Sequence, residues 1–236
     1  MIGGLSRTIT LYLAPLLALT ATILSLLAYL APTLLLNDQV ALLVVSPSTA
    51  LSQSGPSQKI DGPSVFLGVL GSCARSKNDA PLNCTAPAFS SSYVLDALPN
   101  NAPRLLLSAP SAATPVFLAI ALALSVFFLF SFTLISFREK MPGKVGGVFG
   151  KPMVQRASAL IGFFGFMVGL TAFLIIRMWF GKAVQDFNAT IAAEGAQGPK
   201  LIAEIGNAFT MVWVAYAFSA IPIIISLTKL NVLTKA

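Results

Sequence analysis

The sequence predicts an all-α membrane protein, a bundle of four transmembrane helices with a small extracellular loop that contains β-strands and a disulfide. The chain is 56% apolar and only 10% charged, which places it outside the soluble globular class. Each expected span contains a run of about 20 residues without Asp, Glu, Lys or Arg, enough to cross a hydrocarbon core of about 30 Å. Because lipid offers the backbone no hydrogen-bonding partner, these segments should be helical. The spans are expected at about residues 8–30, 115–137, 157–179 and 205–228, and together they make residues 1–236 a single membrane domain.

The first span, residues 8–30, is interpreted as a retained signal anchor. A cleaved signal peptide is the alternative, but its apolar core usually covers only about 7–15 residues. The apolar run here is longer, only Arg7 precedes it, and Ala28 and Ala31 do not form a convincing cleavage site.

Residues 31–114 form the large outer loop, and their composition predicts structure in it. The β-branched run within residues 40–45 and the apolar segment 65–70 are typical of strands. Ser, Pro, Gly and Gln between residues 46 and 61 indicate a turn, and a short helix is expected around residues 93–98. The simplest arrangement is a small extracellular sheet over the helical bundle.

Two cysteines, Cys73 and Cys84, lie in this outer loop. The expected oxidising environment favours a disulfide between them, and a free reactive thiol pair is the alternative. In the chain-entropy model, closing a loop of this size stabilises the fold by about 2.7 kcal/mol.

The cysteines belong to a recognisable pattern, Gly68-Val69-Leu70-Gly71-Ser72-Cys73 followed by ten residues and Cys84. This pattern, with four spans, a long first loop and a shorter second one, resembles the fungal Sur-seven/PalI family of eisosome-associated, claudin-like four-span proteins. Leu70 stands near the place of an aromatic residue in the family motif. The resemblance implies a fungal plasma-membrane protein linked to membrane organisation or signalling, with motif residues Gly68, Gly71, Cys73 and Cys84.

Residues 138–156 form a short hairpin between the second and third spans, and its basic residues set the orientation. The two outer loops carry equal numbers of basic and acidic residues, so the net charge of +7 lies on the side of this hairpin and the termini. By the positive-inside rule the hairpin and both termini should be cytosolic. The basicity therefore reflects membrane orientation and not nucleic-acid binding. Contact with anionic lipid, at about 1 kcal/mol per charge, is expected for this cluster, with a purely topological role as the alternative; its members are Arg138, Lys140, Lys144, Lys151 and Arg156.

Gly162, Gly165 and Gly169 form a stripe of small residues on the third span. Small residues let helix backbones approach closely in lipid. The stripe is expected to pack inside the protein's own bundle, and contact with another subunit, including a second copy of the chain, is the alternative.

The second outer loop, residues 180–204, is expected to be a short loop or a helical extension of the neighbouring spans. It contains the sequon Asn188-Ala189-Thr190, and the first loop contains Asn83-Cys84-Thr85. Both Asn83 and Asn188 are therefore candidate glycosylation sites on the expected outer side.

Composition also excludes several chemistries. The chain has no His, which removes His-based acid–base and nucleophilic catalysis, and two Cys are too few for a zinc cage or an iron–sulfur cluster. We expect neither a metal nor another cofactor. The runs within the spans carry no charged residue that would line an ion path.

These observations predict a non-catalytic plasma-membrane tetraspan. It should organise a lipid domain or act as an accessory subunit of a larger integral membrane protein, such as a transporter or proton pump, met laterally in the bilayer. The alternatives are a channel or transporter component and a claudin-like protein of cell-surface adhesion or signalling.

Overall fold

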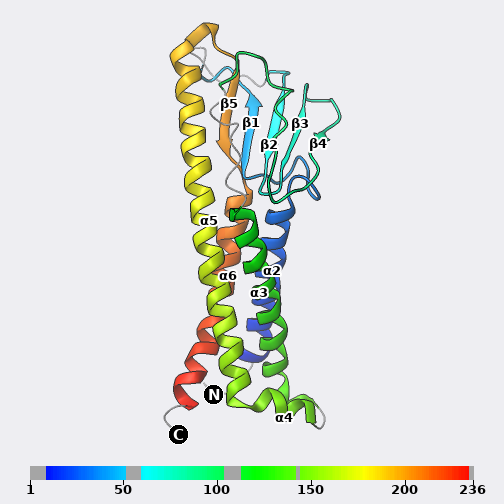
Figure 1. Ribbon diagram of the computed structural model, residues 1–236, viewed down its shortest axis with the longest axis vertical. Helices are drawn as coiled ribbons and strands as arrows, with labels where there is room; N and C mark the ends of the chain where they lie inside the picture. The colour runs from blue at the N-terminus through cyan, green and yellow to red at the C-terminus, as the bar shows by residue number, and fades with distance from the viewer. Residues whose placement is uncertain (1–8, 52–59, 104–112, 142–143, 234–236) are drawn as a thin grey trace. The chain divides into compact units, whose positions relative to one another are not determined.

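The computed structural model describes residues 9–51, 60–103, 113–141 and 144–233 (Figure 1). Within these ranges the chain is mostly helical, with a small sheet and one disulfide. Four of its helices are long and apolar enough to cross a membrane, as expected of a multi-pass membrane protein: Leu11–Leu30, Ala113–Ser136, Pro152–Gln197 and Ala208–Thr228.

The described chain divides into two compact units. Unit 1 comprises residues 1–26, 117–172 and 212–236, and unit 2 comprises residues 27–116 and 173–211. The four long helices are α2 (Ala14–Leu30), which continues a π-helical turn at Ile9–Leu13, α3 (Ala113–Ser136), α5 (Pro152–Glu194) and α6 (Ala208–Leu233).

Unit 1 is held together by an apolar cluster and by hydroxyl groups. Ala14, Phe128, Phe132 and Ile223 form its buried centre. The hydroxyls of Ser131 on α3 and Ser158 on α5 share a hydrogen bond of 2.7 Å, the type of contact that joins helices in lipid.

Other hydroxyls in these helices bond to their own helix backbone. Thr22 donates to the carbonyl of Ala18, Ser125 to that of Ala121 and Thr133 to that of Leu129, at 2.7–2.9 Å.

Between α3 and α5 lie a short 3-10 turn, η3 (Arg138–Lys140), and helix α4 (Lys144–Gly150). The two pack closely, because a Cβ at Gly146 would lie 2.8 Å from the carbonyl oxygen of Arg138. The hairpin predicted at residues 138–156 is therefore partly helical.

Unit 2 contains a five-stranded antiparallel sheet in the order β4-β3-β2-β1-β5. Its strands are β1 (Leu43–Pro47), β2 (Ser64–Leu67), β3 (Ser72–Arg75), β4 (Asn83–Cys84) and β5 (Leu201–Ile205). The strands predicted within residues 40–45 and 65–70 are confirmed as β1 and β2, each shifted by a few residues or shortened.

The helix predicted at residues 93–98 is wrong. This segment forms a turn, closed by a bond of 2.8 Å from the amide of Leu98 to the carbonyl of Leu95, and its earlier polar groups bond to the sheet region. The amide of Val94 donates to Ser72 Oγ at 2.9 Å, and the hydroxyl of Tyr93 donates to the carbonyl of Gly68 at 3.0 Å.

In the second outer loop, the expected alternative of a helical extension holds for the third span, and a strand precedes the fourth. Helix α5 continues through residues 180–194, where Lys182 and Asp186 form an ion pair one turn apart. It ends before Gly195, which adopts a left-handed backbone with φ of 59°. The fourth helix begins at Ala208 and not at residue 205, because Leu201–Ile205 pairs with β1 as strand β5.

Candidate functional site

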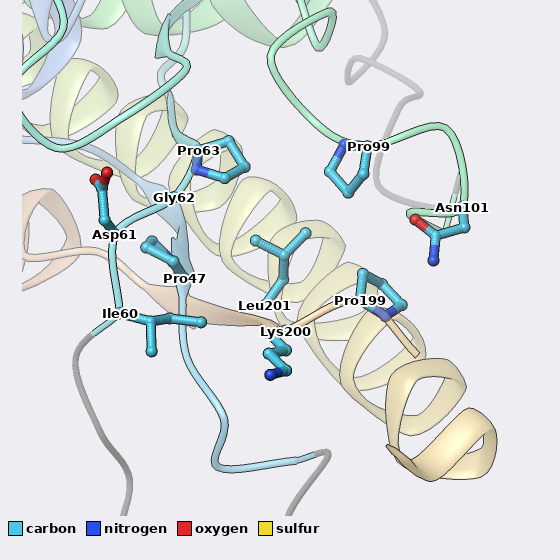
Figure 2. Close-up of a pocket in the computed structure, with 10 residues that line it drawn as sticks. All are labelled: Pro47, Ile60, Asp61, Gly62, Pro63, Pro99, Asn101, Pro199, Lys200 and Leu201. Carbon is cyan, nitrogen blue, oxygen red and sulfur yellow. The ribbon is translucent and has the colours of Figure 1, made fainter. Parts of the chain in front are cut away.

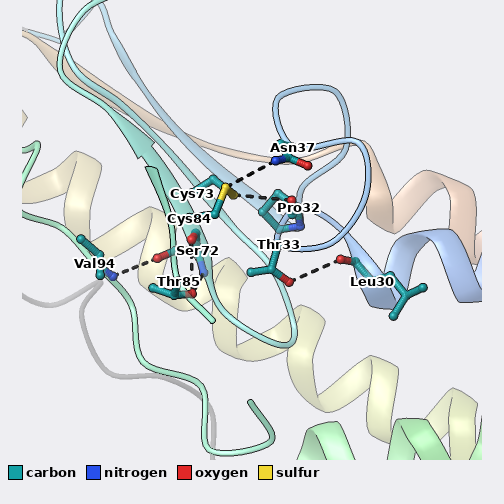
Figure 3. Close-up of a disulfide and its surroundings, with 9 residues drawn as sticks. All are labelled: Leu30, Pro32, Thr33, Asn37, Ser72, Cys73, Cys84, Thr85 and Val94. Carbon is teal, nitrogen blue, oxygen red and sulfur yellow. Dashed lines mark hydrogen bonds between the residues drawn. A yellow bond between two sulfur atoms is a disulfide. The ribbon is translucent and has the colours of Figure 1, made fainter. Parts of the chain in front are cut away.

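Gly68 and Gly71 lie in the turn between β2 and β3, and Cys73 on β3 is bonded to Cys84 on β4 (Figure 3). The amide of Gly68 donates to the carbonyl of Gly71 at 2.9 Å, which closes the turn. A Cβ at Gly68 would lie 2.2 Å from the carbonyl oxygen of Ala31, and a Cβ at Gly71 would lie 2.2 Å from Thr85 Oγ1. Both positions therefore need glycine for close approach.

Cys73 and Cys84 face each other across β3 and β4, with their Cα atoms 4.0 Å apart, and form a disulfide. Cys73 is completely buried, and the amide of Asn37 donates to Cys84 Sγ at 3.5 Å. The carbonyl oxygen of Pro32 lies 3.5 Å from Cys73 Sγ; since a disulfide sulfur carries no hydrogen, this is a packing contact. The predicted disulfide is confirmed, and neither thiol is free.

A hydrogen-bonded network surrounds the disulfide. The amide of Ser72 donates to Thr85 Oγ1 at 3.0 Å, and the amide of Thr85 donates to the carbonyl of Ser72 at 2.9 Å. With the bond from Val94 to Ser72 Oγ, the network fixes the segment after β4 against β3. Motif and network thus form a structural clamp that holds the edge of the sheet.

A pocket of about 310 Å³ lies elsewhere in unit 2 (Figure 2). Its walls come from β1, the residues before β2, the loop after β4 and the start of β5, and four of its lining residues are prolines: Pro47, Pro63, Pro99 and Pro199. Asp61 and Lys200 contribute its charged groups, and Asp61 Oδ1 already accepts a hydrogen bond of 2.9 Å from the amide of Asn78. We assign no ligand to this pocket.

The glycine stripe lies on the buried face of α5. A Cβ at Gly162 would lie 2.5 Å from the ring of Phe128, and one at Gly165 would lie 2.9 Å from the Cβ of Leu124. At Gly169 it would meet the hydroxyl of Tyr216 at 2.3 Å. All three glycines therefore pack against α3 or α6 of the same chain, as expected for internal packing.

Sequence reasoning missed one residue beside the basic hairpin, Tyr12. The ammonium of Lys140 donates to the hydroxyl of Tyr12 at 2.7 Å and lies 5.1 Å from the centre of the Tyr12 ring and 5.7 Å from that of Phe137. The available signal was an aromatic residue near the end of an apolar span, a typical interfacial position.

The other basic residues of the cluster differ in exposure. Lys151 and Arg156 are exposed and Arg138 is half-buried, whereas the side chain of Lys144 lies outside the described residues.

The two sequons lie in different surroundings. Asn83 is exposed on the edge strand β4. Asn188 is half-buried on α5, where its amide nitrogen donates to the carbonyl of Ala203 at 2.9 Å and its amide oxygen accepts from the amide of Ala203 at 2.9 Å. The register with β1 leaves these two groups of Ala203 on the outer edge of β5, so the side chain of Asn188 occupies the position of a neighbouring strand.

We expect Asn188→Ala to lower the free energy of unfolding by about 1–3 kcal/mol, because Ala203 is buried and would lose both partners. Thermal unfolding of purified protein made without glycosylation measures this. Asn83→Ala, at the exposed position, is the matched control and should change stability by less than about 0.5 kcal/mol. Equal effects of the two substitutions would contradict the edge-capping role of Asn188.

No cluster of three or more His, Cys, Asp or Glu suited to a metal ion occurs in the described part of the chain. No protein-family model and no curated protein matched the chain. Its function is therefore inferred from the residues and their geometry.

Proposed function

We propose that the protein is a non-catalytic, claudin-like four-span protein of the plasma membrane, with both termini cytosolic. It organises a lipid domain or serves as an accessory subunit of a larger integral membrane protein. The resemblance to the Sur-seven/PalI family is part of this proposal, and the clamp that joins Gly68, Gly71 and the Cys73–Cys84 disulfide supports it.

The observation that carries the proposal is the division of α5 into two faces. One face buries the glycine stripe against the protein's own helices. The opposite face exposes large apolar side chains, among them Phe164 at 57% and Met178 at 75%. In water such a surface would aggregate, whereas in a bilayer it meets lipid or another membrane protein. The exposed residues of this face include Leu160, Phe164, Met167, Ile175 and Met178.

The runs within the four spans carry no Asp, Glu, Lys or Arg, which favours a role without an ion or proton path. The hydroxyls of Thr22, Ser125 and Thr133 are engaged with carbonyls of their own helices.

Gentle extraction from native membranes, followed by measurement of particle mass and identification of co-purifying proteins, tests the proposal. An accessory subunit is expected to purify in fixed stoichiometry with a larger membrane protein, and tagging that protein should recover this chain. A lipid-domain organiser is expected as a homo-oligomer with enriched lipid. A lone monomer without enriched lipid or protein, or ion flux through purified protein in liposomes, would contradict the proposal.

A further inference from the structure

We propose that Lys140 and Tyr12 form a binding site for the phosphate of an anionic lipid headgroup, at the end of α3. The proposal deepens the proposed function and rests on it in one respect, the placement of the four apolar helices in a membrane.

The first argument is the fixed position of the Lys140 ammonium. A surface lysine is usually mobile and loses rotamer freedom when it binds a ligand. Here the ammonium donates to the hydroxyl of Tyr12 and lies 5.1 Å and 5.7 Å from the ring centres of Tyr12 and Phe137. The rings themselves pack edge to face, with centres 5.8 Å apart. The cation is therefore held in place before any ligand arrives.

The second argument is that the held cation can still bind an anion. An ammonium has three N–H donors, and the bond to Tyr12 uses one of them. Lys140 is exposed, and Tyr12 is 52% exposed, so both reach the surface of unit 1. The Tyr12 hydroxyl accepts from Lys140 and retains its own proton, which it can donate to a phosphate oxygen. Ammonium and phenol together thus present donors to one phosphate group.

The third argument identifies the ligand as a lipid. Close in sequence to Lys140, the hairpin exposes two apolar side chains, Val148 at 47% and Met153 at 82%, together with the basic Lys151 and Arg156. Exposed apolar groups beside basic ones are typical of a surface that lies in the membrane interface, where acyl chains and phosphates are both within reach. Binding of a free phosphate would not require the apolar groups. Glu139 is the sole acidic residue in the sequence 138–156, so positive charge prevails there.

The experiment measures binding of short-chain phosphatidylserine and phosphatidylcholine to the full-length protein in detergent by native mass spectrometry. Lys140→Gln is expected to weaken phosphatidylserine binding at least about fivefold, the effect of one membrane-facing charge, and to weaken phosphatidylcholine binding less, because the choline cation offsets the phosphate charge. Lys151→Gln is the matched control, because it removes the same charge without an aromatic contact and should have a smaller effect.

Tyr12→Leu provides the sharpest test, because it removes no charge. The proposal predicts that Tyr12→Leu weakens phosphatidylserine binding, with Tyr12→Phe intermediate since the ring remains. Thermal unfolding of each variant in phosphatidylcholine checks that the bundle is intact, and Tyr12→Phe keeps the test valid if the leucine variant is unstable.

Three results would overturn the proposal. One is equal loss for Lys140→Gln and Lys151→Gln with no effect at Tyr12, which indicates nonspecific charge attraction. Another is binding of inorganic phosphate as tight as that of phosphatidylserine, which indicates a soluble ligand. The third is wild-type binding of both lipids with equal affinity. Co-purification of a partner protein is measured separately, so failure of the lipid site leaves the proposed function standing, and the reverse also holds.

Discussion

Replacement of both cysteines, Cys73→Ala with Cys84→Ala, is expected to lower the free energy of unfolding of unit 2 by about 2–5 kcal/mol. The disulfide joins β3 to β4, and β4 is only two residues long. Backbone pairing over so short a strand contributes little by itself, so the covalent link fixes the sheet edge. Loss of the link should also release the segment after β4, which the bonds between Ser72 and Thr85 hold against β3.

Thermal unfolding in detergent, together with limited proteolysis of the segment between β4 and α3, measures this loss. Reduction of the wild-type protein should reproduce the behaviour of the double variant. Lys77→Ala, an exposed change between the two cysteines, serves as the control and should alter stability by less than about 0.5 kcal/mol. A double variant as stable and as protease-resistant as the wild type would show that the hydrogen-bonded network alone holds the sheet edge.

The double substitution Gly162→Ala with Gly169→Ala is expected to lower the free energy of unfolding by about 2–6 kcal/mol. Each added methyl overpacks a helix contact, at about 1–3 kcal/mol, and the two sites are about 10 Å apart along α5, so their effects should add. At Gly162 the methyl would lie 2.5 Å from the buried ring of Phe128. At Gly169 it would meet both the Tyr216 hydroxyl at 2.3 Å and the Cβ of Ala121 at 2.9 Å.

Unfolding of the purified variant by denaturing detergent measures the change. Gly147→Ala on α4 is the matched control: nothing lies within 4 Å of its added Cβ, and alanine favours a helix over glycine by up to about 1 kcal/mol. If instead the double variant keeps its stability but loses an oligomeric or partner contact, the glycine stripe serves an interface between subunits.

The helical spans could be predicted from the sequence because charge-free apolar runs of this length have few alternatives. The disulfide could also be predicted, since the chain has only two cysteines and both fall in one loop. Strand β5 could not be predicted. Its five residues come just before an apolar helix, and they are mostly apolar themselves, so the sequence shows no boundary between strand and helix. Its strand conformation depends on pairing with β1, more than 150 residues earlier in the chain.

The contact between Tyr12 and Lys140 could not be predicted from the sequence either, because it too joins residues that are far apart in the chain. The two residues are 128 positions apart, and no short motif joins them. From the sequence, Lys140 and Lys151 are equivalent members of one basic cluster. The three-dimensional structure distinguishes them, because it shows the aromatic rings of Tyr12 and Phe137 beside the ammonium of Lys140. The glycine stripe, in contrast, could be predicted to pack because its spacing alone puts all three residues on one helix face.

The side-chain amide of Asn188 also determines whether another strand can pair with the β5 edge of the sheet. An exposed strand edge invites pairing with strands of other molecules, which leads to aggregation. On β5 the backbone groups of Ala203, at the middle of the strand, are already taken by this amide. A single polar side chain on a helix therefore blocks the pairing of a further strand with β5, and so protects the sheet from edge-to-edge association.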